Sequence, residues 1–490
     1  RTKFDVPLWQ LTQMPRLALL DARGNRLKAL EYRRDFYVQP GSGAGNYSAD
    51  VIFGGYGITA NSLGYDDYAN TSTRGKIVLA IIGTPPFNRF EGENYGTWYS
   101  KAENAMSHGA VGLILVDSPA EPTPHYIERW RGGWTIYRNL VILGASIEMA
   151  DELLKDTGLT LSSVQRTIDQ DLKPQSSSLN RQLHVSVEVS FTEIAEAYNV
   201  LGFIPGSDPT ASKKAVIIGA HYDHWGKDVD GQIFRGANDD ASGVAVMMEI
   251  ARVFSAAVRP RWSVLFAAWS GEEECLCGSY AYVGSPSFPL EETVAYLNLD
   301  MVGYGRQLLC EVSEAHKELR TVVTESAEQL GISFNLQGFS GSSDQVPFEE
   351  KRVQNLMFIY WPDEFYHTPA DTADRVSTRK LLETARLTAL TTLELAEVMV
   401  MKPTTTSALT SAQFVNQVFT IDALLIVGVA FTISAAAGAF HFRRRKQLTC
   451  MSSGSEEEAD DRLQRLVRTR RRESSIYDNL TQFQSSFGSD

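Results

Sequence analysis

The stretch KAVIIGAHYDH, residues 214–224, is a run of apolar residues that ends in two imidazoles and a carboxylate. Two later stretches have the same form: RWSVLFAAWSGEE, residues 261–273, and TVAYLNLDMVG, residues 293–303. Uniformly apolar runs are typical of strands covered on both faces, and hence of a largely parallel sheet. Between the first two, ASGVAVMMEIARVFSAA (241–257) has the pattern of a crossover helix, entered through Asp and Ser residues. The sequence therefore predicts an α/β fold, with a mostly parallel mixed sheet flanked by helices.

The bulk composition is that of a folded protein of several domains. The chain has 490 residues, of which 43% are hydrophobic and 21% charged, and this length corresponds to roughly three domains. A net charge of −13 and the lack of a basic stripe argue against nucleic acid as a partner. Four cysteines are too few for a disulfide framework, and Cys275 and Cys277 are too close in sequence for an easy bridge.

The N-terminal third predicts an accessory domain. GKIVLAIIG (75–83) and AVGLILVD (110–117) are short apolar runs, and YSKAENAMSHG (99–109) between them has helical spacing. This strand–helix–strand pattern carries no cluster of metal-ligand residue types. We therefore expect a domain without chemistry of its own.

The C-terminal region predicts a membrane anchor. ALLIVGVAFTISAAAGAF (423–440) has no charge and reaches the length of a membrane span. A buried core helix is the alternative, but RRRK (443–446) follows directly, as expected on the cytoplasmic side. We expect a transmembrane helix over 418–442, a Ser/Thr-rich stalk over 403–417 and a disordered cytoplasmic tail over 443–490.

This topology places the body of the protein outside the cytoplasm, in an extracellular or lumenal space. The first residues, RTKFDVPLW, do not have the pattern of a signal peptide, and a mature chain would begin in the same way. The sequence makes no prediction of oligomeric state.

Polar side chains gather where the apolar runs end. In open α/β sheets, ligands bind just beyond the carboxyl ends of the strands. The candidates there are His221, Asp223, His224, Asn238, Asp239, Asp240, Glu272, Glu273, Glu274, Asp300, His367 and Asp371. So many carboxylates would repel one another unless cations neutralise them, and imidazoles with carboxylates suit zinc or another borderline divalent metal.

Ordinary structural roles are the alternative for each of these residues. An acidic run such as Glu272–Glu274 is usually a solvated face, but here it terminates a buried strand, which favours a function. A lone histidine is usually structural. We assign that role to the histidines outside the cluster, which are His108, His125, His184, His316 and His441.

Six stretches in this order resemble the M28 family of di-zinc peptidases, the aminopeptidase and glutamate-carboxypeptidase-like group. They are GAHYDHWG, GANDDASGV, AAWSGEEECLCGS, LNLDMVG, SGSSDQVPF and YHTPADTADR, and the resemblance covers roughly residues 190–400. ADVIFGGYGITANSLGYDDYANTSTRGKIVLAIIG with GAVGLILVD resembles the protease-associated domain often inserted before such a peptidase.

The resemblance implies a zinc-exopeptidase fold with a β-rich α/β protease-associated domain. It implies an N-terminal segment (1–40) that packs on the catalytic domain, a protease-associated domain (41–175) and a peptidase domain (176–402).

The resemblance also implies a ligand set for two zinc ions per chain. His221 and Asp300 would hold one ion, Glu273 and His367 would hold the other, and Asp239 would bridge them. Two metals close together lower the pKa of a water molecule and polarise a carbonyl group.

Two further roles follow from the resemblance. Glu272 would be the general base, and Asp223 would orient His221 through its carboxylate. The peptide bond after the bridging aspartate, here Asp239–Asp240, is cis in the family.

Three positions depart from the family pattern. Cys275 stands where glycine is frequent, and Gln345 stands where histidine is common, which could change the substrate pocket. His224 matches no ligand, and we expect it to be a pocket or surface residue.

These residues predict a membrane-anchored zinc exopeptidase, most consistent with an aminopeptidase that releases N-terminal residues from peptides. One alternative is a carboxypeptidase or dipeptidase that binds a substrate carboxylate through Arg235, Arg306 or Arg352, and a related cyclase is another. A non-enzymatic receptor-like scaffold would have lost its ligands, whereas all five are intact here.

Overall fold

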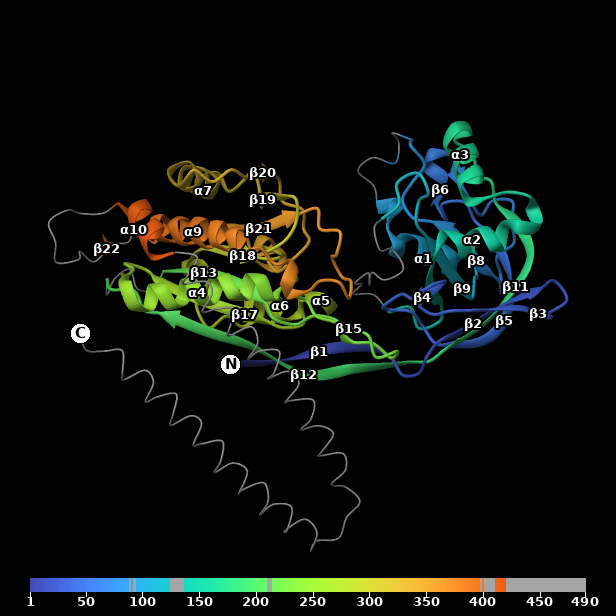
Figure 1. Ribbon diagram of the computed structural model, residues 1–490, viewed down its shortest axis with the longest axis horizontal. Helices are drawn as coiled ribbons and strands as arrows, with labels where there is room; N and C mark the ends of the chain where they lie inside the picture. Colours follow the sequence, from blue (N-terminus) through green and yellow to red (C-terminus); the bar gives the residue numbers. More distant parts are fainter. Residues whose placement is uncertain are drawn as a thin grey trace, which may run out of the picture. The chain divides into compact units, whose positions relative to one another are not determined.

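The structure is a computed structural model of the whole chain (Figure 1). It describes residues 1–87, 90, 94–123, 136–208, 214–396, 399–400 and 410–419. All of these fall within the first of the two units into which the chain divides, Arg1–Leu424.

Sheet I is a mixed sheet of eight strands. In spatial order they are β1 (Thr2–Leu11), β12 (Val189–Ile204), β17 (Ser263–Trp269), β13 (Ala215–His221), β18 (Thr293–Leu299), β21 (Asn355–Trp361), β19 (Gln307–Glu311) and β20 (Asn335–Gln337). The four central strands, β17, β13, β18 and β21, are parallel. The three apolar runs of the sequence form β13, β17 and β18, and the crossover helix is α4 (Ala241–Ala257). The prediction of a mostly parallel mixed sheet is confirmed.

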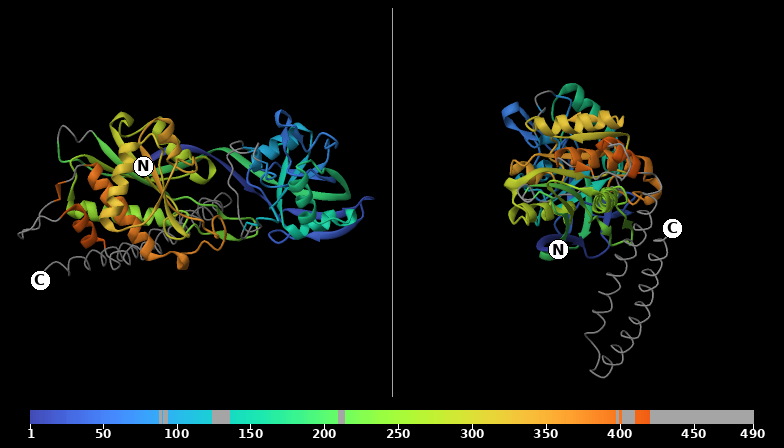
Figure 2. Two further views of the ribbon diagram at one scale, coloured as in Figure 1. Left: turned by 90° about the horizontal axis from the view of Figure 1, so that it is seen from above. Right: turned by 90° about the vertical axis from the view of Figure 1, so that its left-hand side faces the viewer.

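Helices cover both faces of sheet I because successive strand residues point to opposite sides. On one face, Val216 and Ile218 pack in a cluster with α4, α7 (Lys317–Leu330), α9 (Thr378–Leu395) and α10 (Ser411–Val418). On the other face, Ile217 packs in a cluster with α6 (Cys277–Gly284) and α8 (Val346–Glu350). Figure 2 shows α7 and α9, in yellow and orange, beside the strands from two directions.

Sheet II forms the core of the N-terminal lobe, residues 12–188. In spatial order its strands are β3 (Arg26–Leu30), β2 (Arg16–Asp21), β11 (Ser177–Val187), β5 (Gly45–Phe53), β8 (Ile77–Ile81), β9 (Gly112–Val116), β10 (Val141–Ala145) and β4 (Phe36–Val38). Helix α1 (Trp98–Ser107) packs on one face, and α2 (Ile147–Leu154) and α3 (Leu161–Asp171) pack on the other. The predicted strand–helix–strand pattern is β8, α1 and β9.

The strands cross the domain limits that we expected. Strand β1 belongs to sheet I, whereas β2, β3 and β4, from the same expected N-terminal segment (1–40), belong to sheet II. Strand β11, expected at the start of the peptidase domain, also belongs to sheet II, because it pairs with β2 and β5. The N-terminal lobe is thus inserted between β1 and β12, which pair with each other.

Residues 411–417, which we expected in a stalk, form helix α10 (Ser411–Val418) together with Val418, which we expected to begin the membrane span. Thr410 caps its N-terminus, and Phe414 and Val415 are buried against the core of sheet I. The Ser/Thr-rich composition concealed this helix, whose apolar residues recur at helical spacing. Most of the predicted membrane span lies outside the described residues, and among the residues that are described, no helix has the length and apolar character to cross a membrane.

The remaining elements are short. They are β6 (Thr59–Ala60), β7 (Tyr65–Asp66), β14 (Gly226–Lys227), β15 (Ile233–Phe234), β16 (Val258–Arg259), β22 (Met399–Val400), α5 (Glu272–Cys275), and the 3₁₀ turns η1 (Asn61–Leu63), η3 (Asn94–Gly96), η4 (Lys155–Thr157), η5 (Leu290–Glu292) and η6 (Ala373–Arg375).

Candidate metal centre

The candidate ligands meet at the carboxyl edge of the four parallel strands. His221 ends β13, Asp300 follows β18, and Glu273 lies on α5, directly after β17. His367 lies in the loop after β21, and Asp239 lies in the loop before α4. All five side chains are largely buried. Residues far apart in the sequence therefore form one cluster.

Asp239 lies between two groups of side chains. Its Oδ1 is 3.1 Å from Nε2 of His221, which is 3.6 Å from Oδ1 of Asp300. Its Oδ2 is 3.1 Å from Nε2 of His367, which is 3.1 Å from Oε2 of Glu273. The residues that the sequence assigned to two metals thus lie as two groups that share Asp239.

Several of these atoms make no hydrogen bond. Nε2 of His221, Oδ2 of Asp239 and Oδ1 of Asp300 are buried without a hydrogen-bond partner among the described residues, although each has a charged neighbour. Ligand atoms of a tetrahedral zinc ion, at bond lengths of about 2.0–2.1 Å, lie about 3.3 Å apart. Separations of 3.1–3.6 Å between the imidazole nitrogens and carboxylate oxygens of the two groups therefore fit a zinc ion.

Other carboxylates of the cluster bind backbone amides instead. Asp240 accepts the N–H groups of His221, Gly243 and Met301, so it caps α4 and ties its start to β13 and β18. Its carboxylate lies near the carboxylate of Asp300 and the imidazole of His221, yet the bonds to the backbone amides occupy its oxygens. Asp371 likewise accepts the N–H groups of Asn238 and Asp239. These two aspartates shape the loops that hold the ligands.

Asp223 differs from our expectation. Its carboxylate accepts the backbone N–H groups of Glu272, at 3.2 Å, and of Glu273, at 3.3 Å. Nδ1 of His221 instead lies 3.2 Å from the backbone carbonyl oxygen of Asp223, and 3.9 Å from its Oδ1. The tight turn after β13 brings the backbone carbonyl of Asp223 next to the ring of His221. The carboxylate of Asp223 is then available to accept the N–H groups of α5.

The charges of the cluster act on one another. Burial alone would raise the pKa of Asp239, but the neighbouring His221 and His367 hold it well below its usual value. Burial raises the pKa of Glu272 well above its usual value, and Glu273 and Asp300 add to this although His221 opposes it. Oε2 of Glu272 lies 3.9 Å from Nε2 of His221. Glu272 therefore faces the ligands without belonging to either group.

Residues 199–392 match the model of Peptidase family M28. The chain contains an M28 peptidase domain. The match begins in β12 and ends in α9, so it includes every candidate ligand.

Curated relatives carry aminopeptidase names. The chain is 26% identical over 371 residues to aminopeptidase YwaD of Bacillus subtilis, an alignment covering 72% of this chain and 69% of that protein. It is 26% identical over 300 residues to aminopeptidase NAALADL1 of Mus musculus, covering 50% of this chain but only 38% of that protein. The chain also spans less than half, 44%, of an aminopeptidase of Pseudomonas aeruginosa, at 28% identity.

Solved structures share the fold. An aminopeptidase from Aneurinibacillus sp. strain AM-1 superposes with a TM-score of 0.57 at 23% identity, covering 81% of this chain and 83% of that one. BSAP, a zinc aminopeptidase from Bacillus subtilis, superposes with a TM-score of 0.53 at 21% identity, covering 80% and 84%.

The M28 domain contains two polar contacts that the sequence did not predict. Nδ1 of His224 lies 2.6 Å from Oε1 of Glu273, so His224 reaches the cluster and is no surface residue. Ser343 donates to Oδ2 of Asp300 at 2.7 Å. The position of His224, three residues after His221, was the only sequence signal for the first contact. Gln345 is buried and accepts a hydrogen bond from Asn298, so it belongs to the interior of the M28 domain.

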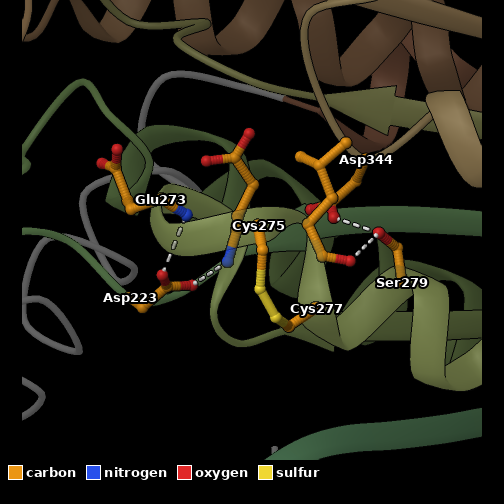
Figure 3. Close-up of a disulfide and its surroundings, with 8 residues drawn as sticks. Asp223, Glu273, Cys275, Cys277, Ser279 and Asp344 are labelled. Atoms are coloured by element: carbon orange, nitrogen blue, oxygen red, sulfur yellow. Dashed lines mark hydrogen bonds between the residues drawn. A yellow bond between two sulfur atoms is a disulfide. The ribbon is translucent and has the colours of Figure 1, made fainter. Parts of the chain in front are cut away.

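Cys275 and Cys277 form a disulfide, a pairing that the sequence left open and that their short separation did not favour (Figure 3). The intervening Leu276 has a left-handed backbone, with φ of 53°, which turns the chain between α5 and α6 and brings the two side chains together. Figure 3 shows the bridge between two polar contacts, the carboxylate of Asp223 on the α5 amides and Ser279 on Asp344. The bridge thus lies two residues beyond Glu273. The peptide bond Asp239–Asp240 is cis, as the resemblance implied.

Proposed function

We infer that this chain is a metal-dependent aminopeptidase of the M28 type that hydrolyses peptide bonds at the N-terminus of peptide substrates. One observation carries this inference: two groups of buried imidazole and carboxylate side chains share Asp239 at the carboxyl edge of an M28 domain, and atoms of His221, Asp239 and Asp300 in them make no hydrogen bond among the described residues. The aminopeptidase names of relatives such as YwaD support the reaction.

We assign His221, Asp239 and Asp300 to one zinc ion, and Asp239, Glu273 and His367 to the other. The distances between their nitrogen and oxygen atoms support this assignment. When bound, two such ions polarise the scissile carbonyl group and make a water molecule acidic enough to attack at neutral pH.

Glu272 is the general base in this proposal. Its carboxylate is largely buried and faces His221. Among the described residues, no backbone N–H group donates a hydrogen bond to it. It accepts the proton of the attacking water and passes it to the leaving amine. Asp223 holds α5 in place by accepting the backbone N–H groups of Glu272 and Glu273. The two adjacent side chains can therefore point in different directions, Glu273 as a metal ligand and Glu272 as the base.

Tyr366 is a further candidate for catalysis. Its ring stacks on His367, with centroids 3.6 Å apart. Burial raises the pKa of its hydroxyl well above the usual value, and Asp239, Glu273, Glu272 and Asp300 add to this. A hydroxyl that stays protonated among these carboxylates is a suitable donor to the oxygen of the scissile carbonyl, where negative charge develops.

The arginines considered for a carboxypeptidase or dipeptidase do not favour that alternative. Arg235, Arg306 and Arg352 are all exposed. A residue that binds a substrate carboxylate inside a site is expected to be at least partly covered, as bidentate Arg–carboxylate pairs are strongest when desolvated.

The rest of the chain is assigned by sequence. The N-terminal lobe is proposed as a protease-associated domain without chemistry of its own. Residues 423–440 are proposed as a membrane anchor with the M28 domain on the extracytoplasmic side. The chain is 28% identical over 199 residues to the vacuolar membrane protease of Candida dubliniensis, of which it covers 20%. The name of this relative supports a membrane location.

Hydrolysis of Leu-, Ala-, Lys- and Glu-p-nitroanilides by the full chain tests the function. Bound zinc is counted in the same sample, with and without chelator. Release of nitroaniline that is lost on chelation and returns with zinc supports an aminopeptidase. Two bound zinc ions with cleavage only of N-terminally blocked peptides would contradict it.

A further inference from the structure

The two carboxylate oxygens of Glu273 have different neighbours. Oε2 faces Nε2 of His367 at 3.1 Å, on the side of Asp239. Oε1 is 2.6 Å from Nδ1 of His224, which makes it the acceptor of a short, charge-assisted hydrogen bond. Because an ionised carboxylate can only accept, the hydrogen lies on Nδ1 of His224. The hydrogen bond makes Oε1 the poorer ligand and leaves Oε2, on the side of Asp239, as the oxygen best placed for a metal.

The structure holds His224 in this position. Its side chain is only 8% exposed, and its ring packs edge to face against that of His367. A Cβ atom at Gly236 would lie 2.5 Å from Cγ of His224, so only glycine leaves room for the ring beside the loop that leads to Asp239. His224 is thus fixed from two sides and is not a mobile surface group.

We propose that His224 is a positioning residue that confines Glu273 to metal binding through a single oxygen. This proposal rests on the proposed function and concerns the ion assigned to Asp239, Glu273 and His367. One atom from each residue gives three protein ligands, and a catalytic zinc site keeps its fourth position for water or substrate. Without His224, Glu273 can rotate and offer both oxygens, so the protein supplies four ligand atoms and the water or substrate becomes a fifth.

The experiment compares His224→Leu with His224→Asn in the full chain. Leucine removes the donor, whereas the amide nitrogen of asparagine lies close to the position of Nδ1 and restores it. We expect His224→Leu to weaken one of the two zinc-binding steps about 10–100-fold, in competition with a chelator of known affinity. His224→Asn should bind zinc nearly as tightly as the unchanged chain.

The cobalt-substituted protein gives a second readout that a general loss of stability does not change. A fifth ligand atom weakens the visible absorption of four-coordinate cobalt. We expect weaker absorption for His224→Leu and an unchanged spectrum for His224→Asn.

The matched control is His316, whose Nε2 lies 2.6 Å from Oε2 of Glu349 outside the metal centre. Its side chain is 10% exposed, so His316→Leu removes a similar His–Glu contact. It should change the melting temperature but neither zinc binding nor the cobalt spectrum.

Unchanged zinc affinity and cobalt spectrum in His224→Leu would overturn the proposal, as would a His224→Asn variant as impaired as His224→Leu. The proposed function fails separately, if the unchanged chain binds no zinc or binds it without hydrolysing any N-terminal anilide.

Discussion

Nδ1 of His221 lies 3.2 Å from the backbone carbonyl oxygen of Asp223, two residues further along the chain. A ring nitrogen held by a backbone group keeps its partner when the side chain of Asp223 is replaced. The ring of His221 is therefore oriented by the turn after β13, and the carboxylate of Asp223 acts on α5. This separation can be tested.

Replacement of Asp223 should affect α5 more than metal binding. Asp223→Ala leaves the amides of Glu272 and Glu273 without their acceptor, which costs about 1–3 kcal/mol of unfolding free energy. Asp223→Asn keeps one acceptor oxygen and should lose less. Removal of a partner that orients a metal-binding histidine lowers metal affinity by about 10–100-fold. We expect a smaller loss of zinc affinity in Asp223→Ala, measured by competition with a chelator. A larger loss of zinc would mean that the carboxylate does orient His221.

Glu272→Gln should abolish turnover and leave both zinc ions bound, because it removes a base and no ligand. We expect kcat to fall by at least about 100-fold. Glu274→Gln, two residues further along α5, is the matched control and should keep most of its turnover. Near-normal hydrolysis by Glu272→Gln would show that another group takes the proton.

Asp239→Ala should lose zinc and activity together, because both groups of side chains share this carboxylate. Zinc content after dialysis and anilide hydrolysis measure the two losses. A variant that kept both ions would disprove the bridging assignment.

Metal removal should destabilise the M28 domain as well as inactivate it. Without cations the buried carboxylates repel one another, and a ligand at 100 times its Kd contributes about 2.7 kcal/mol of unfolding free energy. We expect chelator to lower the melting temperature of the unchanged chain and added zinc to restore it. The melting temperature of Asp239→Ala should respond little to chelator.

The N-terminal lobe should become less stable between about pH 4 and pH 7. Burial raises the pKa of Asp67 from 3.8 to about 7, although the N–H groups of Ile58 and Tyr56 and the hydroxyl of Tyr65 oppose this. In that range the folded lobe keeps a proton that the unfolded chain has released, so its stability falls as pH rises. Lys101, whose pKa burial lowers to about 7, is protonated in both states over most of this range.

Unfolding of the full chain by denaturant at pH 4.5 and pH 7 measures this dependence. Asp67→Asn, which cannot titrate, should flatten it. The prediction fails if the two proteins show the same change with pH.

The sequence predicted the parts of the structure that local patterns determine. Apolar runs gave β13, β17 and β18, and helical spacing gave α4. The candidate ligands were found because each polar group directly follows one of these strands or lies in a loop at the same edge.

Other features depend on contacts between distant residues, and local patterns do not predict them; the bridging role of Asp239 came from the family resemblance alone. No local pattern distinguishes Asp239, which faces two imidazoles, from Asp240, whose oxygens are bonded to three backbone amides. The contact of His224 with Glu273 depends on how two loops meet. The disulfide depends on the left-handed backbone of Leu276, which its side chain does not reveal.

Leu11 and Val189 lie opposite each other at the end of the antiparallel pair formed by β1 and β12. In topological terms the N-terminal lobe is a very large hairpin loop, because the chain leaves sheet I and returns to it at neighbouring positions. A hairpin loop can lengthen, shorten or be exchanged while the strands keep their register. Because Val200 of β12 pairs with Ala268 at the carboxyl end of β17, this loop leaves sheet I at the same edge as the metal centre. An exchanged lobe would therefore change what the chain attaches beside that edge, while the metal ligands remain on other elements.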